Sequence, residues 1–190
     1  CKQLFQKLDS FLLFLIEEDW SPSKASGSHH NVIEDMLVFI NSIVPTMRDI
    51  STELTASVFK SCFIHASRKI LTVLASSEVR TINMVGIVNL SRDGRYIESF
   101  IEENITEIKN IKEAVGSLTE FTNLMMMENF DSYLDLQSRH LRYPHLEPTQ
   151  VIPILEKFKD LGMFKSQEGI PKVKKSAVQA FLKKLRAVEQ

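Results

Sequence analysis

The chain has 190 residues, of which 44% are apolar and 25% charged, and its formal net charge at neutral pH is -1. A chain of this length can bury about 70% of the surface that its unfolded form exposes, so a substantial core is expected. The near-neutral charge excludes a global attraction to nucleic acid or membrane, although acidic residues predominate over residues 93–135 and lysines over residues 157–186.

Apolar residues recur every three to four positions almost throughout the chain, which predicts an all-α protein. The first helix is expected over residues 2–18, before a Ser/Gly/Lys/His loop at residues 21–30 that has the composition of a mobile surface segment. Asn31 is expected to cap a second helix, which Pro45 should kink or end early. The third helix is expected over residues 52–75.

The second half of the chain predicts further helices. After a cap at Asn83, one helix should end near Glu103, and a single long helix should follow over residues 106–127. A short element around residues 130–136 should lead into an extended connection at residues 142–148, because a residue before proline avoids helical geometry. Two more helices are expected, one starting at Pro148 or near Ile152 and ending at Gly162, and one over residues 172–189.

The helical stripes also predict which side chains are buried. Leu54, Cys62 and Ala177 are expected on the inner faces of their helices, and His65 at the boundary of the core. The consecutive methionines at residues 125–127 span most of a helix circumference, so at least one of them should be buried.

The helix that starts after Asn83 has polar residues within its apolar side. Met84, Ile87, Val88 and Ser91 form one stripe at helical spacing. The adjacent stripe contains Val85 and Gly86, then Asn89, then Arg92 and Asp93, and then Tyr96. This second stripe has two interpretations, an ordinary solvated face or a binding surface for a partner.

The sequence offers little catalytic or ligand-binding chemistry. Gly94 and Gly116 lie in helical patterns without a preceding strand, so a phosphate loop is not expected. His29 and His30 lack a third ligand, which favours a solvated pair over a metal site, and the two cysteines favour a reducing compartment. We therefore predict no enzyme activity, no cofactor and no metal. The C-terminal lysines lack interleaved aromatic residues, which argues against nucleic acid, and we expect a solvated face, with acidic lipid or acidic protein as alternatives.

Several motifs follow one another in a fixed order along the chain. They are EDW at residues 18–20, LVFINSI at 37–43, INMVGIVNLSRDGRYIESF at 82–100, SYLD at 132–135, RYPHLEPTQVIPILEKFKD at 142–160 and FLKKLR at 181–186. In this order they resemble the C-terminal region of the Sec-fifteen family of exocyst subunits, also called exocyst complex component six. The chain departs from the family at Val88, where phenylalanine is common, and at Ser91, where aspartate follows Asn-Leu.

The resemblance implies a rod-like stack of antiparallel helical bundles, as in multisubunit vesicle-tethering complexes. We expect residues 1–103 to form one bundle and residues 104–190 a terminal bundle packed end to end on it. Because the chain starts without methionine at the edge of a helix, we also expect it to be a fragment of a longer protein.

For function, the resemblance implies a non-catalytic interaction domain that binds the GTP form of a Rab GTPase and other exocyst subunits, with a myosin motor tail as a further partner. The domain would be cytoplasmic and peripheral at secretory vesicles and at sites of exocytosis on the plasma membrane. Asn89 matches the family asparagine that is tied to Rab binding. By helical geometry, Gly86, Arg92, Asp93 and Tyr96 flank it. The alternative is a structural module that contacts only neighbouring subunits or a motor tail, without the GTPase.

Overall fold

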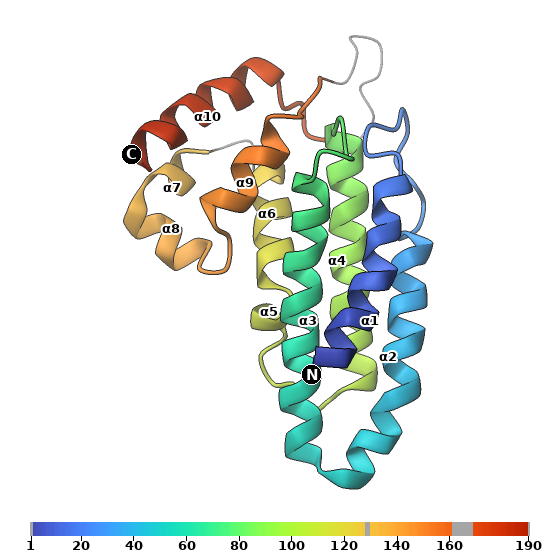
Figure 1. Ribbon diagram of the computed structural model, residues 1–190. Coiled ribbons are helices and arrows are strands. Elements are labelled where there is room, and N and C mark those ends of the chain that lie inside the picture. Colours follow the sequence, from blue (N-terminus) through green and yellow to red (C-terminus); the bar gives the residue numbers. More distant parts are fainter. Residues whose placement is uncertain (1, 128–129, 161–168, 190) are drawn as a thin grey trace.

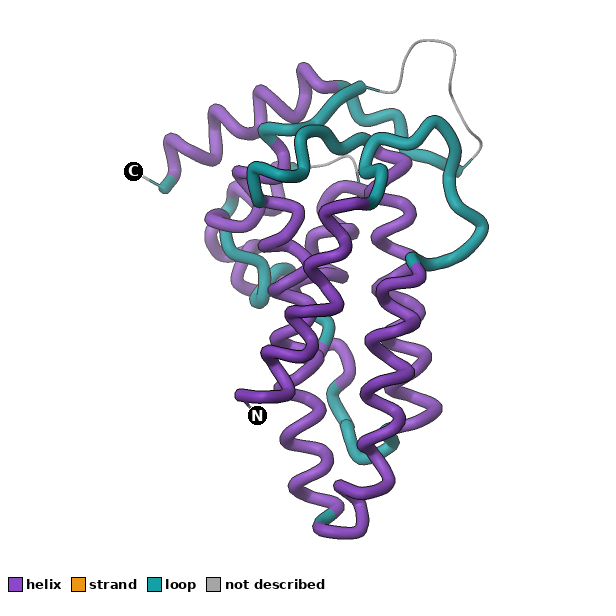
Figure 2. Tube along the Cα trace, turned by 45° about the vertical axis from the view of Figure 1, so that its right-hand side comes forward, coloured by secondary structure: helices purple, strands orange, loops and turns teal. Residues whose placement is uncertain are grey.

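The computed structural model describes residues 2–127, 130–160 and 169–189. Within these ranges the regular elements are all helices, and the β contact found there is an isolated parallel bridge between Ile82 and Phe158 (Figures 1 and 2). The predicted all-α class is confirmed. The elements are α1 (Lys2–Leu12), the 3-10 helix η1 (Leu13–Glu17), α2 (Asn31–Ile50), α3 (Thr52–Ala75), α4 (Met84–Asn104), α5 (Ile111–Ala114), α6 (Gly116–Met126), α7 (Asp131–Leu134), α8 (Leu136–Arg142), α9 (Pro148–Leu155) and α10 (Lys175–Val188).

Helices α1 to α4, in the N-terminal half of the chain, form a helical bundle (Figure 1). Helix α3 is at its centre, because it packs against α1 and α2 on one side and against α5, α6 and α9 on the other. Helix α4 packs against α2, α5 and α6. None of the helices in the described ranges combines the length and the apolar character needed to cross a membrane.

Two polar caps set the starts of α3 and α4. The hydroxyl of Ser51 accepts the N–H of Leu54 at 3.3 Å, and Oδ1 of Asn83 accepts the N–H of Gly86 at 3.0 Å. These bonds satisfy backbone donors that have no partner inside the helix. The predicted bounds of α3 and the predicted cap at Asn83 are confirmed. The predicted burial of Leu54 is wrong, since this side chain is 44% exposed in the first turn of α3, at the end of the bundle.

Helix α2 differs from its prediction at both ends. His30 occupies the N-cap position and Asn31 is the first helical residue, so the predicted Asn31 cap is wrong. Pro45 lies inside the helix, which continues to Ile50. The predicted early end is therefore wrong, and Met47, two residues beyond the proline, still packs on the core.

The predicted first helix is also shorter than expected. Helix α1 ends at Leu12, and the chain tightens into the 3-10 helix η1 before Glu18. Side chains Leu13 and Phe14 lie in this tighter turn and are exposed.

The single helix predicted over residues 106–127 is wrong. Asn110 Oδ1 accepts the N–H of Glu113 at 3.3 Å and so starts the separate short helix α5. Helix α6 then begins at Gly116, which faces the ring of His145 so closely that an added Cβ would lie 2.5 Å from Nδ1. Only glycine permits this approach, and the helix is interrupted there.

Helix α8 was not predicted. Asp135 precedes it, and its carboxylate accepts the N–H of Ser138 at 2.8 Å, which is the bond of an N-cap. The connection predicted at residues 142–148 follows α8, over residues 143–147 between α8 and α9.

Helix α9 begins at Pro148, which was one of the two predicted starts. The other predicted start, near Ile152, is wrong. The helix ends at Leu155 rather than at Gly162, which lies outside the described residues. Helix α10 begins at Lys175, three residues later than expected. Its inner stripe contains Val178 instead of the predicted Ala177, which is exposed.

The remaining predictions for the core are confirmed. Cys62 is buried, and burial raises the pKa of its thiol to about 11. His65 lies at the edge of the core, with Nε2 2.8 Å from a carboxylate oxygen of Asp9. Of the three consecutive methionines, Met125 is buried and Met127 is exposed.

Helices α7, α8 and α10 enclose an aromatic cluster beside the main bundle. Phe181 of α10 stacks on Phe130 with ring centroids 4.5 Å apart and meets the edge of Tyr133 at 6.1 Å. Arg139 is buried against this cluster, where its Nε donates to the Tyr133 carbonyl at 2.8 Å and Nη1 lies 2.5 Å from Glu189 Oε1. Its Nη2 has no hydrogen-bond partner within the described part of the chain.

Three distant segments meet at the start of α4. The N–H of Ile82 donates to the Lys157 carbonyl at 3.1 Å, and the N–H of Lys159 donates to the Ile82 carbonyl at 2.8 Å. The next N–H, that of Asn83, donates to the Trp20 carbonyl at 3.0 Å. The connection before α4 is thus bonded both to the end of η1 and to the segment after α9.

Candidate functional site

The polar stripe of α4 is covered by the loop at residues 21–30. Figure 1 shows this loop running beside the upper end of α4 on its way from η1 to α2. Asn83 makes the first contact, because its Nδ2 donates to the Pro22 carbonyl at 3.0 Å. Ser21 adds a hydroxyl bond to Thr81 at 2.9 Å. The loop therefore begins its path fixed to the start of α4.

Gly86 permits the closest approach between the loop and the helix. A Cβ at this position would lie 2.2 Å from the Trp20 carbonyl oxygen, which is a backbone atom that no side-chain rotation can move away. Trp20 is itself held in place, because its ring is buried and its indole N–H donates to the Leu15 carbonyl at 2.8 Å. The glycine is required at this position by contact with the chain's own backbone.

Asn89 lies one turn further along α4 and is only 5% exposed. Its Oδ1 accepts the backbone N–H of Ser26 at 2.9 Å and the Nη1 of Arg92 at 3.1 Å. The side-chain oxygen of Asn89 is therefore fully used in holding the middle of the loop.

Asp93 holds the end of the loop. Its side chain is 1% exposed, and its two oxygens meet the backbone N–H of His30 at 2.8 Å and the Nδ1 of the same residue at 2.6 Å. Burial lowers the pKa of His30, but the hydrogen bond and charge of Asp93, with the charge of Glu18 behind them, outweigh that effect. The pKa is raised above its ordinary value of 6.5. The pair is thus a buried, charge-assisted contact.

Tyr96 completes the row of contacts. Its ring stacks on the ring of His29 with centroids 3.6 Å apart and an angle of 6° between the planes. Both residues are half-buried, so one edge of this ring pair remains accessible to solvent.

All five residues predicted for the binding face lie on one side of α4, where Gly86, Asn89 and Asp93 are buried and Arg92 and Tyr96 are half-exposed. We call residues Asn83, Gly86, Asn89, Asp93 and Tyr96 the α4 ladder, since at successive turns they contact Trp20 and the loop that follows it. The solvated interpretation of this stripe is wrong because the loop covers it. The prediction of a solvated His29–His30 pair is also wrong, because both side chains are half-buried against α4, His29 on Tyr96 and His30 on Asp93.

Sequence reasoning did not identify the loop residues that meet the ladder. Ser26 and His30 contribute backbone N–H groups, and a backbone donor leaves no pattern in the sequence. The available signal was on the helix: Gly86 and Asp93 are a small and a charged residue on a stripe that also carries Val85, an unusual mixture for a solvated face.

The described residues contain no group of three or more His, Cys, Asp or Glu side chains placed to hold a metal ion. The buried polar groups of the ladder are bonded to one another and to the loop. The fold and the ladder therefore define a class of protein, an all-helical domain whose buried polar side chains fix the shape of its surface.

The particular family follows from comparison with known proteins. A family model described as the C-terminal part of exocyst complex subunit Sec15 matches residues 1–157, and this chain belongs to that family. The chain is 23% identical to human exocyst complex component 6 over 194 aligned positions, which cover 98% of the chain and 24% of the relative.

More distant organisms give similar matches. Exocyst complex component 6 of Dictyostelium discoideum is 22% identical over 165 positions, covering 82% of the chain and 16% of that protein. Exocyst complex component sec15 of Schizosaccharomyces pombe is 20% identical over 152 positions, covering 80% and 20%. The chain spans about a fifth of the length of these relatives. No solved structure matches it significantly.

Proposed function

We propose that this chain acts as the C-terminal, non-catalytic interaction domain of an exocyst subunit. In this function it tethers secretory vesicles to the plasma membrane during exocytosis, by binding a GTP-loaded Rab GTPase and other exocyst subunits. It works in the cytoplasm and is peripheral to the vesicle and the plasma membrane. Membership of the Sec15 C-terminal family supports the proposal.

The surface proposed for the GTPase is composed of the loop at residues 21–30 and the adjoining side of α4. Ser26, Gly27 and Ser28 are exposed on the loop, and Arg92 and Tyr96 are half-exposed beside it on the helix. GTP orders the switch segments of a GTPase, and a surface of fixed shape that fits only the ordered segments binds that state preferentially.

The proposal rests on Asn89, which is buried and therefore acts by holding the loop in place. Because its oxygen bonds the Ser26 N–H and the Arg92 guanidinium, it fixes both the loop and the neighbouring cation in the shape offered to the partner. Removing this oxygen would break a part-buried hydrogen bond to the Ser26 N–H, at a cost of about 1 to 1.5 kcal/mol to the shape of the loop.

The test is retention of a panel of Rab proteins, in GTP and GDP forms, by the purified chain. We expect one GTP-loaded Rab to be retained, and Asn89→Ala to weaken that retention by about tenfold, as 1.4 kcal/mol of lost ordering requires. Asn123→Ala is the matched control, because Asn123 is an exposed asparagine on α6, away from the loop.

Equal retention of the GTP and GDP forms would overturn the proposal. So would an Asn89→Ala variant that keeps full Rab binding with an unchanged melting temperature. If Asn89→Ala and Asn123→Ala weaken binding equally, the surface at the loop is not the one used.

Exposed apolar side chains favour a second function, assembly with neighbouring subunits or a motor tail. Leu141 on α8 is 83% exposed, and Leu136 on the same helix is also exposed. Large apolar side chains of this kind are typical of surfaces that another protein covers. Leu141→Asp should reduce co-purification of other exocyst subunits or of a myosin tail without changing Rab retention, and an effect on Rab alone would contradict this assignment.

A further inference from the structure

The C-terminal helix concentrates positive charge at one end of the molecule. Residues 169–188 contain six lysine and arginine side chains and no acidic residue, in a chain whose net charge is -1. This segment lies beyond residues 1–157, which the family model matches. Figure 1 shows α10 on the outside of the molecule, away from the long bundle.

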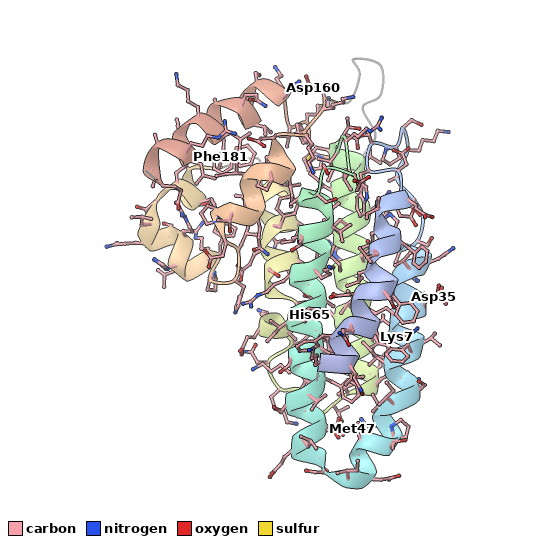
Figure 3. All side chains as sticks on the ribbon, viewed as in Figure 1. Lys7, Asp35, Met47, His65, Asp160 and Phe181 are labelled. Atoms are coloured by element: carbon pink, nitrogen blue, oxygen red, sulfur yellow. The ribbon has the colours of Figure 1, made fainter. Side chains whose placement is uncertain are left out.

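The apolar side of α10 is already occupied by its own fold. Its buried residues are Val178, Phe181, Leu182 and Leu185, and Figure 3 marks Phe181 on the side of α10 that faces the neighbouring helices. A second apolar partner is therefore not required by this helix. What α10 offers to the outside is its polar face.

The outward face of α10 consists of small and basic side chains. Ser176, Ala180, Lys183 and Ala187 are exposed and fall at helical spacing on the side opposite the buried stripe. Lys183 lies within this row, and Lys174, at the N-cap position, and Lys175, in the first turn, lie at the N-terminal end of the helix. A flat surface can therefore approach the small residues closely while the lysine stems extend toward it.

Acidic neighbours neutralise only part of this charge. Arg186 pairs with Glu156, and Lys184 lies 3.8 Å from Asp131, at the two edges of the helix. Within the described part of the chain, the ammonium groups of Lys174, Lys175 and Lys183 form no ion pair with a carboxylate. These three exposed cations remain available to an outside anion.

We propose that the outward face of α10, with Lys183, and its N-terminal end, with Lys174 and Lys175, bind the surface of an anionic lipid bilayer directly. The face is a convex helix without a pocket or a pair of arginine forks, so it suits a broad negative surface better than a specific acidic side chain. Juxtamembrane lysines gain affinity for anionic lipid one by one through this mechanism. The inference goes beyond the proposed function, in which the GTPase provides the membrane contact.

The test is co-sedimentation of the purified 190-residue chain with phosphatidylcholine vesicles, with and without about 30% phosphatidylserine. We expect binding only with the anionic lipid, and loss of binding as NaCl rises from about 0.1 M to about 0.5 M. Lys174→Gln, Lys175→Gln and Lys183→Gln combined should weaken binding about 100-fold, which is roughly fivefold for each lysine.

The matched control combines Lys2→Gln, Lys109→Gln and Lys112→Gln, which removes the same charge from exposed positions outside α10. This variant should keep at least a third of the wild-type vesicle affinity. Equal losses in the two triple variants would show that net charge, and not α10, attracts the lipid, and would overturn the proposal.

Two further outcomes would also overturn it. One is the absence of binding to phosphatidylserine vesicles at low salt. The other is binding to soluble polyglutamate that is as tight as binding to vesicles and equally sensitive to the α10 variant, which would assign the face to an acidic protein. Rab retention by the α10 variant reports separately on the proposed function, because α10 packs on α7 and α9, whereas the loop at residues 21–30 is bonded to α4.

Discussion

Helices α4 and α10 both carry apolar and polar side chains, but different kinds of contact hold them to the rest of the fold. Helix α10 buries an apolar stripe of four residues and leaves its polar side to the solvent. Helix α4 buries apolar residues as well, and in addition covers Asn83, Asn89 and Asp93 with a loop of the same chain. Apolar burial depends on area and tolerates small shifts, whereas each polar contact requires one donor opposite one acceptor.

The difference has consequences for shape. A helix held by an apolar stripe can slide or repack at modest cost, provided that volume is conserved. A loop held by buried, bonded groups has one low-energy position, because each unpaired group costs free energy in a poorly solvated site. The α4 ladder therefore specifies the form of residues 21–30 more strictly than composition suggests.

The largest effect is expected at the apolar helix. Phe181→Ala removes a buried ring that stacks on Phe130 and meets Tyr133, and should lower the free energy of unfolding by about 4 kcal/mol. Chemical denaturation of the purified chain measures this loss. Gln179→Ala, at an exposed position of the same helix, should change stability by less than about 0.5 kcal/mol. A comparable loss in both variants would contradict the importance of the stripe.

A smaller effect is expected from a single methyl group on the ladder. Gly86→Ala forces a Cβ against the Trp20 carbonyl, and should destabilise the chain by about 2 kcal/mol despite the better helix propensity of alanine. Gly94→Ala is the control on the same helix, because its Cβ would meet only Leu118 atoms at 3.7 Å or more. Thermal unfolding should show a lower melting temperature for Gly86→Ala and an unchanged or higher one for Gly94→Ala. Equal shifts would show that the loop does not constrain α4.

The smallest effect is a dependence of stability on pH. The pKa of His30 is raised in the folded chain, so its stabilising contribution is complete below about pH 6.5 and is lost as the pH rises through the folded pKa. Hydrogen exchange of the loop amides, compared after correction for the intrinsic exchange rate, should show less protection above that pH than below it. Asp93→Asn removes the charge that raises the pKa, and should flatten this dependence. An unaltered profile in Asp93→Asn would assign the dependence to another group.

The sequence predicted those parts of the fold that depend on the helical spacing of apolar residues and on side chains that cap helices. The all-α class, the bounds of α3 and the cap at Asn83 were correct, because apolar spacing and a capping side chain are visible in the residues themselves. The errors at residues 106–127 and at α8 have different origins. At residues 106–127, Gly116 contacts His145 where α6 begins, and this tertiary contact is not visible in the sequence. At α8, the carboxylate of Asp135 caps the helix, and this local signal was overlooked.

The candidate site was predictable as a set of residues but not as an arrangement. Spacing on α4 grouped Gly86, Asn89, Asp93 and Tyr96 correctly on one face. It could not show that a loop about sixty residues earlier in the chain covers them, because the backbone N–H groups of Ser26 and His30 carry no residue-specific signal.

The junction at Ile82 and Asn83 connects the two surfaces proposed here. Asn83 is bonded to Trp20, where the covering loop begins, and Ile82 is bonded to both sides of Phe158, in the segment that follows α9 and precedes α10 along the chain. A protein bound at the loop and a bilayer bound at α10 would therefore both act on these two peptide units. If binding at one surface shifts this junction and so alters the other surface, thermodynamic linkage requires each ligand to change the affinity for the other by the same factor.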